Sequence, residues 1–164
     1  MAMDLSTKTD QELNNLIDNH RRKKLLRAPL YLEVLTERGR RRENGLEFVK
    51  SVKIILEAAR EGRCVSYKQL ADASGATWSK VHYAINQHLW DLVRWANGNG
   101  WPMLSAVVVN HKNIENRKMD PETLRGFIAA AEELGRTDIG TDHDAFLAAE
   151  QTRVFEFARE HPEL

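Results

Sequence analysis

The stretch of sequence that decides the fold is residues 62–110, GRCVSYKQLADASGATWSKVHYAINQHLWDLVRWANGNGWPMLSAVVVN. Ser66 and Gln69 have the spacing of a capping box and predict the start of a short helix. Gly75 then supplies a turn, and Thr77 predicts the N-cap of a long amphipathic helix. The apolar, β-branched run LSAVVVN predicts a buried strand after that helix. This order is typical of a winged helix-turn-helix, whose second helix commonly lies in a nucleic-acid groove.

The long helix is expected to run from Thr77 to Asn97, where Gly98 ends it. Its inner stripe is predicted to contain Val81, Ile85, Leu89 and Leu92. Its opposite side is polar, and Asn, Gln and Lys are side chains that read base edges or meet phosphates. The residues expected to contact nucleic acid from this side are Ser79, Lys80, Tyr83, Asn86 and Gln87. An ordinary solvated helix face remains the alternative interpretation.

Trp90 lies further along the same side of this helix and is too large to be left in water without a cause. We expect it to pack against the N-terminal helices or against a second subunit, so it is the candidate residue of a partner interface.

Helical patterns flank the central stretch on both sides. Residues 10–24, 29–42 and 44–61 precede it, and residues 120–134 and 142–159 follow it. The predicted fold class is therefore mainly α with a small β element (α+β), built as a winged helix-turn-helix core with added N- and C-terminal helices. The expected organisation, with all parts on one core, is an N-terminal helical pair (1–44), the winged module (45–119) and acidic C-terminal helices (120–164).

The zero net charge of the chain hides an asymmetry. The first 119 residues contain 20 Lys and Arg against 13 Asp and Glu, whereas the last 45 residues contain 4 against 11. A basic working surface with an acidic C-terminal part is one interpretation, and a chance drift of solvated faces is the other. The polar run HKNIENRK (residues 111–118) is expected to be the wing. The predicted phosphate contacts lie around the start of the short helix and in the wing, and they are Arg63, Lys68, Lys112, Arg117 and Lys118.

Composition excludes several function classes. Cys64 is the single cysteine, so a disulfide framework and a multi-thiolate metal site are both ruled out. The six histidines are scattered, and we expect no metal site and no cofactor. No apolar run approaches the roughly 18 residues that span a bilayer, and the start of the chain is acidic where a signal peptide would be basic. We therefore expect a cytoplasmic protein with no membrane association.

About fifty residues resemble the DNA-binding domain of O6-alkylguanine-DNA alkyltransferases and their alkyltransferase-like relatives. The matching positions of the two helices and the strand are Tyr67, Leu70, Ala71, Gly75, Val81, Ala84, Ile85, Pro102, Val107 and Val108. The resemblance implies a winged-helix DNA-binding fold. The acceptor cysteine of that family would fall near Met103, and its base-replacing arginine near Ser79, so the transfer chemistry is not implied. A second likeness, to a segment of uncharacterised bacterial proteins, implies a bacterial or phage origin.

The sequence thus predicts a non-catalytic DNA-binding protein, in which a regulatory role stays open. A protein–protein adaptor built on the same scaffold is the first alternative, because the isoelectric point near 7.0 is low for a strong DNA binder. A DNA-processing enzyme with an unrecognised site is the weaker alternative. Whether the protein forms a homodimer is left open.

Overall fold

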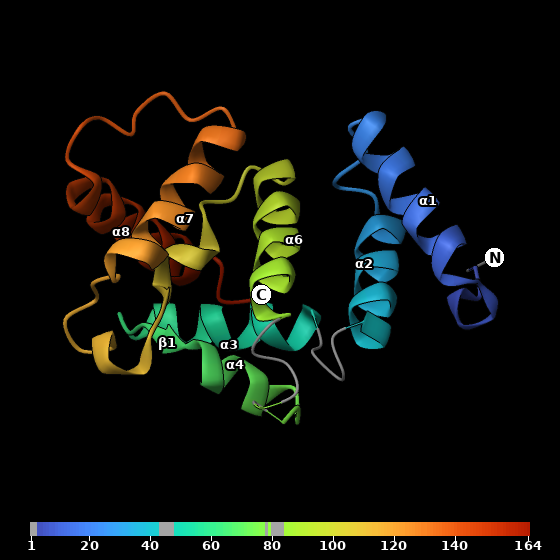
Figure 1. The fold of residues 1–164 in the computed structure, drawn as a ribbon, viewed down its shortest axis with the longest axis horizontal. Helices are drawn as coiled ribbons and strands as arrows, with labels where there is room; N and C mark the ends of the chain where they lie inside the picture. Colours follow the sequence, from blue (N-terminus) through green and yellow to red (C-terminus); the bar gives the residue numbers. More distant parts are fainter. Residues whose placement is uncertain (1–2, 43–47, 78, 80–83) are drawn as a thin grey trace.

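The structure is a computed structural model, and it describes residues 3–42, 48–77, 79 and 84–164. The fold is mainly α-helical with one small parallel sheet, which confirms the predicted class (Figure 1). In chain order the elements are η1 (Leu5–Thr7), α1 (Asp10–Arg22), α2 (Pro29–Arg42), α3 (Phe48–Arg60), β1 (Val65–Ser66), α4 (Tyr67–Ala73), α6 (Ile85–Gly98), η2 (Leu104–Val107), β2 (Val108–Val109), η3 (His111–Asn113), α7 (Pro121–Glu133) and α8 (His143–Glu160).

Local capping chemistry sets several helix starts where the sequence places them. Thr9 and Glu12 form a complete capping box at the start of α1, and Ser66 and Gln69 form another at the start of α4. Helix α2 has the predicted bounds. Helix α1 ends two residues earlier than predicted, because the chain turns at Lys24, whose φ of 57° is left-handed.

The core lies where helices α3 and α8 pack along each other, with α6 standing against α3. In Figure 1, α6 lies between α7 on one side and the α1–α2 pair on the other. Ile85, Leu89 and Leu92 are buried, as the predicted stripe requires, whereas Val81 lies outside the described residues. A buried polar contact also joins α3 to α6, since Ser51 Oγ lies 2.8 Å from Nε2 of His88. Helix α6 is thus anchored by apolar packing and by a specific hydrogen bond.

The sheet differs from the one that the sequence predicts. Strand β1 pairs in parallel with β2, with Val65 opposite Val108. The predicted strand over 104–110 is wrong in its first half, because residues 104–107 form the 3-10 helix η2. The side-chain amide of Gln151, on α8, donates to the carbonyl of Ala106 at 3.0 Å, so this backbone group needs no neighbouring strand.

The segment expected to be the wing also differs. Residues 111–113 form η3, and the chain then turns directly into the approach to α7. In the part of the chain that the structure describes, β2 is not followed by an antiparallel hairpin.

The end of α6 corrects a second expectation. Gly98 is the last residue of the helix, and the stop is Gly100, whose φ of 76° is left-handed. The amides of Gly100 and Trp101 donate to the carbonyls of Asn97 (3.0 Å) and Ala96 (2.9 Å), the pair of bonds that closes a Schellman motif. Gly98 serves packing instead, because a Cβ there would lie 2.3 Å from Cβ of Leu26. The glycine allows the α1–α2 connection to approach α6 closely.

Candidate nucleic-acid interface and adjoining pocket

Two arginines from distant parts of the chain meet at Gly62, just after the end of α3. Nη2 of Arg117 donates to the carbonyl of Gly62 at 2.6 Å, and Nε of Arg159 donates to the carbonyl of Arg60 at 3.2 Å. A Cβ built on Gly62 would lie 3.2 Å from Nη2 of Arg159 and 3.8 Å from Nη2 of Arg117, so both guanidiniums cover this residue. Arg63 follows directly in sequence. We call Arg63, Arg117 and Arg159 the Gly62 arginine cluster.

The Gly62 arginine cluster has a structural role and retains unused donors. The last carbonyls of a helix lack intrahelical partners and carry partial negative charge, so guanidiniums stabilise them. Each guanidinium has five N–H donors, and one donor binds a carbonyl in each of Arg117 and Arg159. Among the described residues, neither of these two arginines has a carboxylate within ion-pair distance, whereas Arg63 lies 2.6 Å from Glu61. The cluster therefore presents donors to an anion from outside.

Sequence reasoning found two of the three members of this cluster. Arg63 and Arg117 were predicted phosphate contacts. Arg63 follows Gly62 in the sequence, and the structure brings Arg117 to Gly62. Arg159 was missed because it belongs to the acidic C-terminal part of the chain. One signal in the sequence could have indicated it. Arg159 lies near the end of the last predicted helix, and that helix was expected to pack on the same core as Arg63 and Arg117.

The other predicted phosphate contacts have different surroundings. Lys68 lies 3.5 Å from Asp72, and Lys112 lies 3.3 Å from Asp120. The hydrogen bond from Lys112, with smaller contributions from two asparagine amides, holds the pKa of Asp120 below its usual value. Lys118 is exposed. Exposed ion pairs of this kind contribute little to stability, so these lysines can exchange their carboxylate for another anion.

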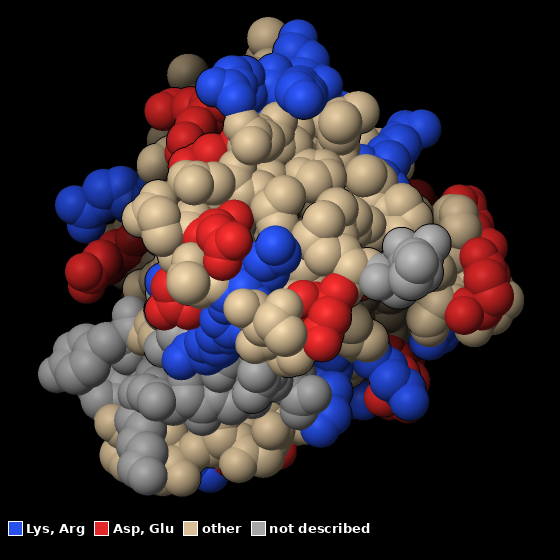
Figure 2. Space-filling model, turned by 90° about the vertical axis from the view of Figure 1, so that its right-hand side faces the viewer, with Lys and Arg blue, Asp and Glu red and all other residues tan. Residues whose placement is uncertain are grey.

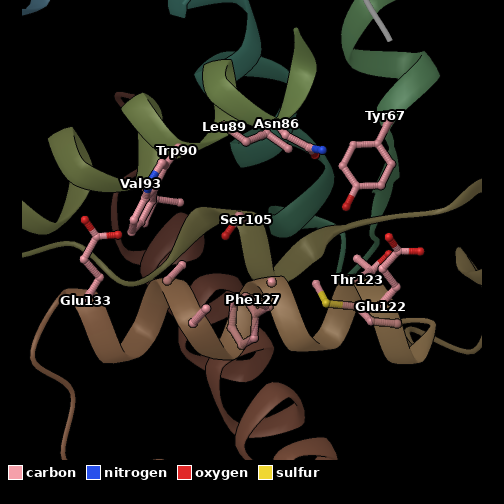
Figure 3. A pocket seen from close by; sticks show the side chains of 14 residues that line it. Tyr67, Asn86, Leu89, Trp90, Val93, Ser105, Glu122, Thr123, Phe127 and Glu133 are labelled. Carbon is pink, nitrogen blue, oxygen red and sulfur yellow. The ribbon is translucent and has the colours of Figure 1, made fainter. Parts of the chain in front are cut away.

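The polar side of α6 is divided between two neighbours. The amide of Asn86 points toward Tyr67 of α4, as Figure 3 shows. Gln87 instead donates to Asp91 at 3.1 Å, and Asp91 also accepts from Arg21 of α1 at 3.0 Å. Ser79 is exposed, while Lys80 and Tyr83 lie outside the described residues. The predicted base-reading residues Asn86 and Gln87 thus face different parts of the molecule.

A second group of basic side chains lies at the turn between α1 and α2. Figure 2 views the face that carries these helices, and Lys and Arg gather at its upper end, where Figure 1 places that turn. Below this group, acidic and basic side chains alternate around a broad neutral surface. The exposed members at the turn are Arg22, Lys23, Lys24 and Arg27. They follow the C-terminus of α1, where cations complement the helix dipole, so helix stabilisation accounts for most of them.

A pocket with a volume of about 470 Å³ opens between α4, α6 and α7. Its floor is apolar, and neutral polar side chains enter from four elements, α4, α6, η2 and α7: Tyr67, Asn86, Ser105 and Thr123 (Figure 3). We call it the α6–α7 pocket. Trp90 is half-buried and lines it together with residues of α7, and the guanidinium of Arg94 lies 4.3 Å from the centre of the Trp90 ring. The tryptophan predicted for a partner interface is therefore also part of a pocket wall.

Two carboxylates mark opposite ends of the α6–α7 pocket. Glu122 lies beside Thr123 below the Tyr67 hydroxyl, and Glu133 lies beside Val93 and Trp90 (Figure 3). Burial raises the pKa of Tyr67, while a hydrogen bond with Thr123 opposes that shift. Tyr67 is accordingly a neutral phenol at physiological pH, and the charged groups that line the pocket, as far as the structure describes it, are these two acids.

Cys64 is buried, and burial raises the pKa of its thiol to about 11, with Arg117 opposing the shift. Because the thiolate is the nucleophile, we expect iodoacetamide to label Cys64 only after unfolding at pH 7. In the unfolded chain the pKa of this thiol is near 9.0. The stability that comes from keeping the thiol neutral in the fold is therefore complete below pH 9 and is lost as the pH rises toward 11. Mass spectrometry of the native and the urea-unfolded protein measures the labelling. Rapid stoichiometric labelling of the folded protein at pH 7 would contradict this prediction.

Among the described residues, no three His, Cys, Asp or Glu side chains group as metal ligands. No helix in the described chain is long and apolar enough to cross a membrane. Comparison with models of protein families, with curated proteins and with solved structures found no match. The functional conclusion therefore depends on the residues and their arrangement.

Proposed function

We propose that this protein binds nucleic acid, most simply duplex DNA, and catalyses no reaction on it. The observation that carries the proposal is the Gly62 arginine cluster, in which the guanidiniums of Arg117 and Arg159, from two distant chain segments, converge on Gly62 beside Arg63 in the sequence. Guanidiniums match phosphate oxygens in geometry as well as charge, and phosphate contacts supply most of the affinity of non-specific binding.

The surroundings of the cluster support the same function. The loop that provides Arg117 also provides the exposed Lys118, so a further cation lies next to the cluster in sequence. Arg63 pairs with an exposed glutamate, and a phosphate can replace that weak partner. Helix α4 begins shortly after Arg63, and its neighbour Asn86 offers an amide that can bind a base edge. Phosphates would thus be met at the end of α3 and bases from the α4–α6 side.

Substitution of the cluster tests the proposal. Arg117→Gln and Arg159→Gln are each expected to weaken binding of a random-sequence duplex roughly tenfold at about 50 mM salt, because each removes one phosphate contact and its counterion release. Fluorescence anisotropy with a labelled duplex measures the affinity. Arg125→Gln is the matched control, because Arg125 is an exposed arginine on α7 and its replacement makes the same change in charge. Thermal unfolding verifies that each variant is folded.

Two results would contradict the proposed site. One is unchanged affinity in both cluster variants. The other is a loss of affinity in Lys23→Gln and Lys24→Gln at the α1–α2 turn, with the cluster variants unaffected, which would move the nucleic acid to that face.

Binding of a protein partner is the second candidate function, and Trp90 favours it. A half-buried tryptophan stacked against an arginine, Arg94, is a combination typical of interface hot spots. Light scattering of wild type and Trp90→Ala tests whether a second copy of the chain is that partner. A dimer that is lost in the variant supports this candidate, whereas a monomer in both proteins contradicts self-association.

A further inference from the structure

We infer that the α6–α7 pocket is a binding site for a small flat organic cation, that is, an aromatic ring carrying an amidine or amine. This inference goes beyond nucleic-acid binding and does not depend on it. The volume of about 470 Å³ lies in the range of pockets that hold small organic ligands. The chemistry of its lining then decides which ligand it suits.

The apolar floor of the pocket favours a ligand that carries a flat apolar group. Leu89 and Val93 of α6 face Phe127 of α7 across the pocket (Figure 3), and Met119 also lines it. An aromatic ring covers such a floor fully, at a small cost in conformational entropy. The ring of Trp90 forms part of the wall and adds aromatic surface to it, while the guanidinium of Arg94 lies over this ring, 4.3 Å from its centre.

The polar and charged side chains that line the pocket favour a ligand that carries positive charge. Glu122 at one end and Glu133 at the other are the charged groups that line the described pocket. Arg94 lies 3.4 Å from Glu133 and offsets its charge, so Glu122 is the carboxylate that would receive the ligand cation. Asn86 and Ser105 direct an amide and a hydroxyl into the same space and can accept further N–H donors (Figure 3). Among the described residues, no cation that would compensate an anionic ligand lines the Glu122 end of the pocket.

The glycine at position 126 leaves space free in the α6–α7 pocket. It lies within α7, where glycine is less favourable than alanine because it loses more backbone entropy on folding, and its φ requires no glycine. A Cβ at this position would have no atom within 4 Å, so close packing does not explain the glycine either. The position lines the pocket, and a larger residue would fill space that is now accessible.

Three isosteric probes test the inference: benzamidine, benzamide and benzoate, which are cationic, neutral and anionic at pH 7. Binding is followed by NMR shifts of the Trp90 indole N–H and the Asn86 side-chain amide. We expect benzamidine to bind about tenfold more tightly than benzamide and benzoate to bind most weakly, since only the amidinium can form a charge-assisted hydrogen bond with Glu122. Equal affinities, tighter binding of benzoate, or no shift with any probe would overturn the inference.

Variants then locate the bound probe. Glu122→Gln should weaken benzamidine about tenfold and leave benzamide unchanged, because only the charged contact is lost. Glu132→Gln, an exposed glutamate of α7 outside the pocket, is the matched control. Gly126→Leu should abolish binding of both probes while keeping the fold. If Gly126→Leu unfolds, Ala129→Leu is used in its place. Ala129 is exposed and also lines the pocket, so a leucine there fills the same space. Retained binding in a folded, filled variant would place the probe elsewhere and overturn the inference.

Discussion

Replacing Arg136 by leucine is expected to lower the free energy of unfolding by about 3–5 kcal/mol, because it leaves a buried carboxylate without its main partner. Glu150 on α8 is 1% exposed, and its Oε2 lies 2.6 Å from Nη1 of Arg136. The other carboxylate oxygen has weaker contacts, with Arg153 and the backbone amide of Met103 both at 3.5 Å. Neither contact compensates a charge that is removed from water.

A matched pair of substitutions separates this effect from a simple loss of surface charge. Arg153→Gln removes the half-exposed partner and should cost less than about 1 kcal/mol. Adding Glu150→Gln to Arg136→Leu should recover most of the lost stability, because the uncompensated charge disappears. Urea unfolding followed by circular dichroism measures the three free energies. An Arg136→Leu midpoint equal to that of wild type would mean that Glu150 is solvated, contrary to the structure.

Truncating Leu92 to alanine is expected to cost about 2–5 kcal/mol, the range for deleting most of a large buried aliphatic side chain. Leu92 is fully buried on the inner side of α6. Leu92→Met nearly conserves the volume and should cost less than about 1.5 kcal/mol, and Asn97→Ala on the exposed side of the same helix should have little effect. If Leu92→Ala melts at the wild-type temperature, α6 does not bury this side.

Local chemistry made much of the fold predictable from the sequence. The capping box of Ser66 and Gln69 and the left-handed glycines Gly62 and Gly135 need only neighbouring residues, and all are found where the pattern indicates. The predicted stop at Gly98 failed because the reason for that glycine is a side chain, Leu26, that lies far away in the sequence.

The errors in the strand and in the site have the same tertiary origin. Residues 104–107 were assigned to the strand because they lead into the β-branched run Val107–Val109. They form a 3-10 helix instead, and Gln151 of α8 satisfies the carbonyl of Ala106. Hydrophobic periodicity gave no reason to expect buried Glu150 and Gln151 on α8. Likewise, charge counting separated Arg159 from Arg117, whereas the packing of α8 on α3 brings both to Gly62. Individual cations could be predicted from the sequence, but not their partners.

The salt dependence of duplex binding tests the nucleic-acid proposal most directly. Three guanidiniums that neutralise three phosphates release condensed counterions, so the logarithm of the association constant should fall linearly with the logarithm of salt concentration. We expect a slope of about −3 for the wild-type protein and about −2 for Arg117→Gln, since each contact contributes about −0.9. No binding by the folded protein at low salt, or an affinity that does not change with salt, would contradict nucleic-acid binding through the Gly62 arginine cluster.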